Sequence, residues 1–208
     1  ITGEELVQSY DTIDATQNLD SYAMVSGIVK SCAVNLSKMC NDLRLMSSGP
    51  RTGFCEINLP AKQNGSSIMP GKINPVIPEV VNQVAFNIIG NDVTITMAAE
   101  AGQLELNAFE PIIFYNLFES IQTLSNAVQT LVDNCIVGIT ANEEHCREMV
   151  ESSIGIITAI CPYVGYETAA NIAKEALRTN QSVRELILQK KLLSEEQLKT
   201  ILDPSTMP

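Results

Sequence analysis

Apolar residues recur every three or four positions along the first long stretch of the chain. One stripe consists of Leu19, Tyr22, Ser26, Val29, Ala33, Leu36, Cys40 and Leu43. A second stripe beside it consists of Val25, Ile28, Cys32, Met39 and Met46. Because this spacing places each set on one face of a helix, the pattern predicts a long helix over about 17–47 that is covered on more than one side.

Two further stretches have the same character. Residues 77–100 carry paired apolar positions, and Gly90-Asn91-Asp92 is a candidate kink within them. Residues 111–136 alternate steps of three and four through Phe114, Leu117, Ile121, Leu124, Val128, Leu131 and Cys135. The three stretches together predict an all-α protein built on an up-and-down bundle of long helices.

Capping signals divide the chain into two parts. Asp14 and Gln17 resemble a capping box for the first long helix, and Ser47-Ser48-Gly49-Pro50 is a stop signal after it. After Gly138 the predicted helices are short, and Pro162 and Gly165 are expected to separate them. Their starts are marked by capping boxes at Thr140–Glu143, Ser182–Glu185 and Ser194–Gln197. We therefore predict a central helical-bundle domain over 1–139 and a small C-terminal helical domain over 140–208.

Charge and hydropathy exclude several classes of function. The 208 residues include 13 Lys and Arg against 24 Asp and Glu, a net charge of −11. Nucleic acids and anionic membrane surfaces both require a basic patch, so neither is an expected partner. No apolar run reaches the roughly 18 residues of a membrane-spanning helix, and no signal segment opens the chain. These features favour a cytoplasmic protein.

The cysteine pattern argues against a metal site. The six cysteines form no CxxC pair, and His145 is the single histidine. A structural zinc site normally needs four closely spaced Cys and His ligands, so we expect no metal. The cysteines lie mostly among apolar helical residues, which is typical of buried free thiols in a reducing compartment. We expect His145 to lie at the surface.

Residues 60–76, here called the signature loop, differ from the rest of the chain. The segment Pro60–Pro75 holds three Pro and two Gly beside two Ser, two Lys and two Asn. Packed helices are usually joined by two to eight residues, so a longer polar connection indicates a functional loop. Gly71-Lys72 looks like the end of a phosphate-binding P-loop. That motif is excluded because five residues separate Gly65 from Gly71 and no hydroxyl residue follows Lys72.

The residue types in the signature loop suit a carboxylate. Gly65, Ser66 and Ser67 can present consecutive backbone N–H groups, Lys72 supplies a cation and Asn74 a neutral donor. The positive end of the next helix follows directly after Asn74. In this interpretation Ser66 or Ser67 acts as a nucleophile or a base. The alternative that composition leaves equally open is an ordinary solvated turn.

The run Gly65-Ser-Ser-Ile-Met-Pro-Gly-Lys-Ile-Asn-Pro75 resembles the signature of the fumarase/aspartase superfamily. Within that superfamily, the runs 76–83, 90–92 and 97–107 are similar to aspartate ammonia-lyases, as are the upstream runs Ile13–Asn18 and Asn41–Leu45. Fumarases share the signature but typically differ after it. The resemblance covers essentially the whole chain and corresponds to the C-terminal portion of a family subunit, less than half of it.

This resemblance implies a lyase that eliminates ammonia from L-aspartate to give fumarate. It implies that Ser66 is the base that takes the Cβ proton, while Lys72 and Asn74 bind the substrate carboxylate. Ser67 contributes its backbone N–H, with Gly65 and Glu79 in support. In relatives the glutamate at this position pairs with a histidine of another chain segment. The chemistry requires no metal or organic cofactor.

The resemblance also implies a homotetramer whose active sites each combine three subunits. Two further motif segments of such a site would lie upstream of Ile1, so the chain carries one third of a site and is expected to be inactive alone. Two alternatives stay open. The first is a fumarase-type hydratase of the same superfamily, and the second is that the isolated chain acts as a non-catalytic, self-associating helical scaffold.

Overall fold

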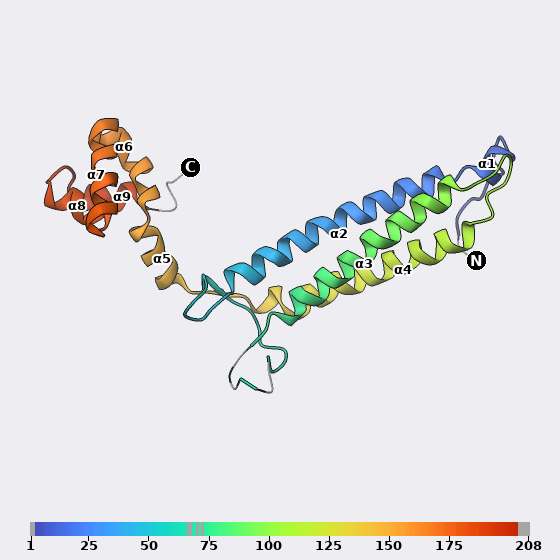
Figure 1. The fold of residues 1–208 in the computed structure, drawn as a ribbon, viewed down its shortest axis with the longest axis horizontal. Coiled ribbons are helices and arrows are strands. Elements are labelled where there is room, and N and C mark those ends of the chain that lie inside the picture. Colours follow the sequence, from blue (N-terminus) through green and yellow to red (C-terminus); the bar gives the residue numbers. More distant parts are fainter. Residues whose placement is uncertain (1–2, 66–67, 70, 72, 204–208) are drawn as a thin grey trace. The chain divides into compact units, whose positions relative to one another are not determined.

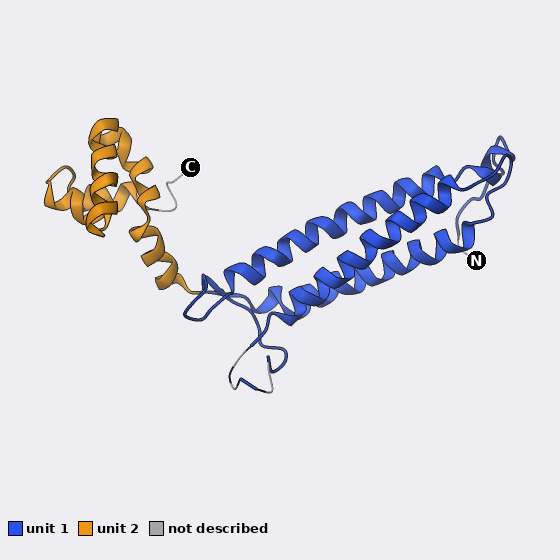
Figure 2. Cartoon of the chain, in the orientation of Figure 1, with its two compact units in different colours: residues 1–141 blue, residues 142–208 orange. Residues whose placement is uncertain are grey.

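A computed structural model describes residues 3–65, 68–69, 71 and 73–203 of the chain. The chain divides into two compact units, residues 1–141 and 142–208 (Figure 2). We describe each unit by itself. Both consist almost entirely of helices, which confirms the prediction of an all-α protein.

The first unit is dominated by three long helices that lie side by side (Figure 1). They are α2 (Asp20–Met46), α3 (Val76–Glu100) and α4 (Glu110–Asn134), and successive helices run in opposite directions. Each lies within three residues of its predicted bounds at either end. The stop signal after α2 is confirmed, since the helix ends at Met46, and α3 continues through Gly90 without a break.

The core of the bundle uses one of the two apolar stripes of α2. Leu19, Ala33 and Cys40 of the first stripe are buried against α3 and α4. In the second stripe, Val25, Ile28 and Met39 are exposed. The prediction that α2 is covered on more than one side is therefore wrong for the single chain, because three helices cover only one face of it.

The predicted stripe of α4 is partly wrong. Leu117 and Leu131 face the core as expected, but Ile121 and Val128 are exposed. The positions that α4 buries in their place are Ile113, Ser120 and Ala127. The contact face is therefore rotated from the predicted one, and it includes the smaller residues Ser120 and Ala127.

A buried acidic residue in the second half of α3 links this helix to the first half of α2. Asp92 accepts a hydrogen bond from the hydroxyl of Ser26 at 2.7 Å, and its other oxygen lies 2.5 Å from Nζ of Lys30. Asp92 and Ser26 are both buried, whereas Lys30 is partly exposed. The pairing satisfies a carboxylate that would otherwise be costly inside the core.

Asn107 fastens the turn between α3 and α4. Its buried amide donates to the carbonyls of Ala98 and Ala99 at 2.9 and 3.2 Å, and its Oδ1 accepts from the N–H of Phe109 at 2.8 Å. One side chain thus provides hydrogen-bond partners for backbone carbonyls at the end of α3 and for a backbone N–H at the start of α4. The backbone N–H of Asn107 also donates to the carbonyl of Thr16, which attaches the N-terminal segment to this turn.

That N-terminal segment corrects the first predicted capping box. Asp14 and Gln17 form their own short helix, α1 (Asp14–Gln17), and do not cap α2. Asp11 takes the capping role for α1, because its Oδ1 accepts from the N–H groups of Ile13 and Asp14. Asn18 is extended and separates α1 from α2.

At the opposite end of the bundle, two segments far apart in sequence pair as strands. β1 (Ile57–Asn58) runs antiparallel to β2 (Thr140–Ala141), with Asn58 opposite Thr140. The predicted capping box at Thr140 is therefore wrong, because this residue is engaged in the strand pair. A 3₁₀ turn, η1 (Ile136–Gly138), joins α4 to β2.

The second unit is a cluster of short helices with its own core. Its elements are α5 (Glu143–Ser152), η2 (Ile154–Ile156), α6 (Ile157–Val164), α7 (Tyr166–Thr179), α8 (Val183–Gln189) and α9 (Glu195–Ile201). The capping boxes at Ser182 and Ser194 are confirmed. Gly165, at a φ of 83°, separates α6 from α7 as predicted, but Pro162 lies inside α6.

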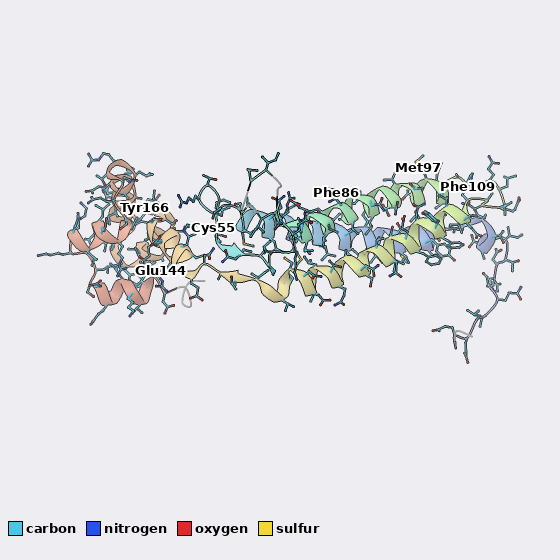
Figure 3. All side chains as sticks on the ribbon, turned by 90° about the horizontal axis from the view of Figure 1, so that it is seen from below. Cys55, Phe86, Met97, Phe109, Glu144 and Tyr166 are labelled. Atoms are coloured by element: carbon cyan, nitrogen blue, oxygen red, sulfur yellow. The ribbon has the colours of Figure 1, made fainter. Side chains whose placement is uncertain are left out.

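Large apolar side chains remain on the outside of the long helices. Phe86 and Met97 of α3, labelled in Figure 3, are 62% and 65% exposed. Ile28 and Met39 of α2 and Phe118 of α4 are likewise exposed. Despite this apolar character, none of the described helices meets the length and hydropathy that crossing a membrane requires.

Candidate active site

The signature loop connects β1 to α3 and includes most of the predicted site residues. Gly65, Asn74 and Glu79 are among the described residues. The predictions for Ser66, Ser67 and Lys72 fall outside the described residues, so the roles of these three side chains stay predictions.

Asn74 and Gly65 close the base of the loop. Nδ2 of Asn74 donates to the carbonyl oxygen of Gly65 at 3.1 Å, across nine positions of sequence. Both residues are partly buried. The contact brings the first and the last parts of the eleven-residue motif together, and the amide of Asn74 has a second N–H that can donate to a ligand.

The N-terminus of α3 begins directly after this closure. Pro75 is the N-cap residue and makes no side-chain capping bond. In the first turn, the N–H of Val76 donates to the carbonyl of Asn74 at 2.9 Å, Pro78 has no N–H, and the N–H of Glu79 donates to the carbonyl of Pro75 at 3.2 Å. The positive end of the dipole of this 25-residue helix favours an anion near Asn74. Such an electrostatic environment suits a carboxylate ligand.

Glu79, in the first turn of α3, faces the end of α2. Its Oε1 lies 4.0 Å from Nη2 of Arg44, and both side chains are partly exposed. The other terminal nitrogen of Arg44, Nη1, donates to Oδ1 of Asn82 at 3.4 Å. One guanidinium thus contacts two side chains on successive turns of α3.

Asn82 is the buried member of this group, at 2% exposure. Its amide nitrogen lies within hydrogen-bond distance of the carbonyl and hydroxyl of Ser37, at 3.1 and 2.8 Å, and of Oδ1 of Asn41 at 3.2 Å. Ser37, Asn41 and Arg44 share one face of α2 because they are spaced by four and three positions. A polar ladder therefore joins the last turns of α2 to the first turns of α3.

Sequence reasoning missed the roles of Arg44 and Asn82. Arg44 belongs to the run Asn41–Leu45 that resembles the family, but no role was assigned to it. Asn82 could have been noticed as a polar residue next to Val81 on a helix face that is otherwise apolar. A polar residue at a core position usually marks a partner on the facing helix.

Two thiols lie in the core next to this polar ladder. Cys40 of α2 and Cys135 after α4 are buried in one cluster with Val81, Ala127 and Leu131. The pKa of Cys40 is raised from 9.0 to about 11, mainly by burial and in addition by the nearby Cys135, while Arg44 opposes the shift. Burial also raises the pKa of Cys135. The expectation of mostly buried thiols is confirmed for these two, whereas Cys32 is exposed and the other three are intermediate.

We expect Cys40 to resist alkylation in the native protein. At pH 8, about a tenth of an ordinary thiol is ionised but only about a thousandth of a thiol with a pKa of about 11, which alone slows reaction about a hundredfold. Peptide mapping after iodoacetamide treatment, with the urea-unfolded protein as control, measures the difference. Equal rates for Cys40 in the two states would contradict the expectation.

The raised pKa of Cys40 makes the free energy of unfolding depend on pH. Because the folded state holds the proton of Cys40 more tightly than the unfolded state does, the stabilisation is complete below about pH 9 and is lost as the pH rises toward 11.

His145 lies on α5 in the other unit, and its side chain is exposed as predicted.

Two family models match the chain. A model described as "Lyase" matches residues 1–90, and a model described as "Fumarase C C-terminus" matches residues 156–208. The first covers α2, the signature loop and the first part of α3. The second covers most of the small helical unit.

Curated relatives match along the whole chain. The aspartate ammonia-lyases of Pseudomonas canavaninivorans, Helicobacter pylori (strain ATCC 700392 / 26695) and Bacillus subtilis are 58%, 56% and 55% identical over 207 residues. In each case the match covers 100% of this chain and 44% of the relative. The chain therefore spans less than half the length of the curated relatives it matches.

Solved structures agree in fold. The fumarate lyase:delta crystallin of Brucella melitensis superposes with a TM-score of 0.93 at 51% identity, over 99% of this chain and 45% of that one. The class II fumarase of Schistosoma mansoni superposes with a TM-score of 0.88 at 32% identity, over 100% of this chain and 44% of that one.

Proposed function

Because the chain belongs to the fumarase/aspartase superfamily, we propose that it is the C-terminal portion of an aspartate ammonia-lyase. The reaction is the reversible elimination of ammonia from L-aspartate to give fumarate. The observation that carries the proposal is the 55–58% identity to curated aspartate ammonia-lyases along the whole chain. The signature loop supplies residues with the chemistry that this elimination needs.

In the proposed mechanism, Ser66 is the base. Its oxyanion takes a proton from Cβ of L-aspartate, and the adjacent carboxylate accepts the resulting charge as an aci-carboxylate. The Cα–N bond then breaks, ammonia leaves with the bonding electron pair, and the Cα–Cβ double bond of fumarate forms. A serine oxyanion is strongly basic, so it requires nearby donors and a cation, which the backbone N–H of Ser67 and the ammonium of Lys72 supply.

Lys72 and Asn74 bind the carboxylate that becomes doubly charged. A preorganised donor of this kind contributes about 3–4 kcal/mol to the transition state. The N-terminal end of α3 adds a favourable field at the same place. Support for the position of Asn74 comes from its contact with Gly65, which holds it at the base of the loop. Glu79 acts in support, paired with a histidine of another chain segment.

A fumarase-type hydratase is the second candidate. It would use the same loop to remove water from malate. The match of residues 156–208 to the "Fumarase C C-terminus" model favours it. Against it stands the lower identity of 32% to the class II fumarase of Schistosoma mansoni.

Activity of the full-length enzyme that contains these residues decides between the two. We expect fumarate to form from L-aspartate, measured by its ultraviolet absorbance, at a kcat/KM at least about a hundredfold above that for L-malate. The reverse preference would assign the chain to the hydratases. Residues 1–208 alone are expected to form no fumarate, since they span 44% of the curated aspartate ammonia-lyase that they match.

We further propose a cytoplasmic homotetramer in which each site combines residues of three subunits. The exposed second stripe of α2, with Val25, Ile28 and Met39, supports this assembly. A row of exposed apolar side chains along one helix face is typical of an interaction surface. The net charge of −11 argues against nucleic acid and anionic membranes as further partners.

Light scattering on the purified chain measures its self-association. A discrete tetramer is the expected result at micromolar concentration, because association covers the second stripe of α2. A monodisperse species of one chain's mass, 22.6 kDa, would contradict it. Polydisperse material would also contradict it for the isolated chain, and would mean that the N-terminal portion is needed to complete the core.

A further inference from the structure

Arg44, near the end of α2, is a charged residue that has no role in the mechanism proposed above. The guanidinium of Arg44 donates a hydrogen bond to Asn82, which is buried in the core. It also lies near the carboxylate of Glu79, which belongs to the proposed site. We propose that Arg44 is a positioning residue for the elimination, and that it acts by orienting the Glu79 carboxylate. This inference rests on the proposed function and extends it to a residue outside the signature motif.

The first step of the argument is that Asn82 is immobilised. Its amide nitrogen contacts two atoms of Ser37 and one of Asn41, and the residue is 2% exposed. None of the buried side-chain polar atoms in the described part of the chain lacks a hydrogen-bond partner. A satisfied buried network of this kind is rigid, so the oxygen that Asn82 presents to Arg44 has a defined position.

The second step is the geometry of the guanidinium. Nη1 contacts Asn82 and Nη2 faces Glu79, so the two terminal nitrogens of one planar group are used on different partners. Because the group is planar and its donors are fixed relative to one another, anchoring one nitrogen orients the other. A lysine ammonium at this position would carry the charge but could not transmit the orientation.

The third step is the need for orientation at Glu79. This side chain is partly exposed and lies in the first turn of α3, five positions after Asn74. A free glutamate samples several rotamers, and holding a partner histidine requires one of them. Arg44 approaches from α2, and so it favours the rotamers that direct the carboxylate toward the end of that helix.

The test compares variants of the full-length enzyme. Arg44→Met removes both contacts, and Arg44→Lys keeps the charge without the planar fork. Lys38→Met is the matched control, since Lys38 is exposed on the same helix and pairs with Asp42 instead. Glu79→Gln, alone and combined with Arg44→Met, completes a double-mutant cycle.

We expect Arg44→Met to lower kcat about three- to tenfold, as befits a partly exposed ion pair, with the KM for L-aspartate changed less than about twofold. Arg44→Lys is expected to fall between Arg44→Met and the parent enzyme, and Lys38→Met to match the parent. In the Glu79→Gln background, Arg44→Met is expected to cause no further loss, because the group through which it acts is already altered.

Two outcomes would overturn the inference. One is a double variant whose kcat falls by the product of the two single effects, which would mean that Arg44 acts independently of Glu79. The other is an Arg44→Met enzyme with the kcat of the parent. Circular dichroism tests whether each variant is folded. If Arg44→Met does not fold, the same comparison is made with Arg44→Lys.

Failure of the proposed function gives a different result. If the parent enzyme converts malate and not L-aspartate, the proposed substrate is wrong. The same variants are then compared with malate, and the expected loss of kcat and its disappearance in the Glu79→Gln background are unchanged.

Discussion

Ser66→Ala in the full-length enzyme is expected to lower the turnover of L-aspartate by about a hundredfold to ten-thousandfold. Alanine cannot take the Cβ proton, and positioned general bases contribute a factor of this size. Binding of an unreactive dicarboxylate inhibitor is expected to stay within about threefold of the parent. The reason is that the base interacts with a proton that moves only in the transition state.

Ser67→Ala is the matched control for this experiment. Its proposed contribution is a backbone N–H, which alanine retains, so its turnover is expected to stay close to that of the parent. Steady-state kinetics and calorimetric titration of the inhibitor measure both quantities. A Ser66→Ala enzyme that keeps more than about a tenth of the parent rate would refute the assignment of Ser66 as the base.

Lys72→Ala is expected to weaken inhibitor binding and turnover together. The ammonium contacts a carboxylate that is charged both before and during the reaction, so its loss raises the free energy of both states. Removal of one partner of a charge pair in an enclosed site costs about 2–5 kcal/mol, which corresponds to at least about thirtyfold in the inhibitor Kd.

Lys62→Ala provides the comparison for Lys72. Lys62 lies in the same loop, is exposed, and carries the same charge. If the loop acts only through its general positive charge, both variants lose affinity equally. Selective loss in Lys72→Ala is expected, and equal effects would show that Lys72 has no specific contact with the carboxylate.

The sequence was a reliable guide to the long helices and a weaker guide to their faces. On α2 the spacing predicted two covered stripes, and only the one with Leu19, Ala33 and Cys40 is buried in the chain. On α4 the same reasoning selected Ile121 and Val128, which are exposed. Hydrophobicity alone does not identify this contact face, since α4 buries the smaller and less apolar Ser120 and Ala127 there.

Local capping signals succeeded where no other segment competed for the residues. Ser182 and Ser194 both form complete capping boxes. Thr140 has the same motif, but its backbone pairs with Asn58, more than eighty positions earlier. A long-range pairing of this kind cannot be anticipated from a four-residue pattern.

The candidate site was predictable through its motif and not through its supporting contacts. The eleven residues from Gly65 to Pro75 are consecutive, so their chemistry could be recognised in the sequence. Arg44 and Asn82 act across the interface between α2 and α3, and their relation depends on how those helices are aligned. The division into domains near residue 140 and the roles of Ser66, Ser67 and Lys72 stay predictions.

The buried Asp92 has a consequence for how the two helices align. Regular apolar stripes such as those of α2 and α3 would tolerate sliding by one helical turn, because one leucine or valine replaces another. Sliding by a turn would draw Ser26 and Lys30 away from Asp92, and an unpaired carboxylate in the core costs about 3–5 kcal/mol. Asp92 therefore favours a single register between α2 and α3. Because the signature loop leads directly into α3, this register also sets the position along the bundle at which the loop ends.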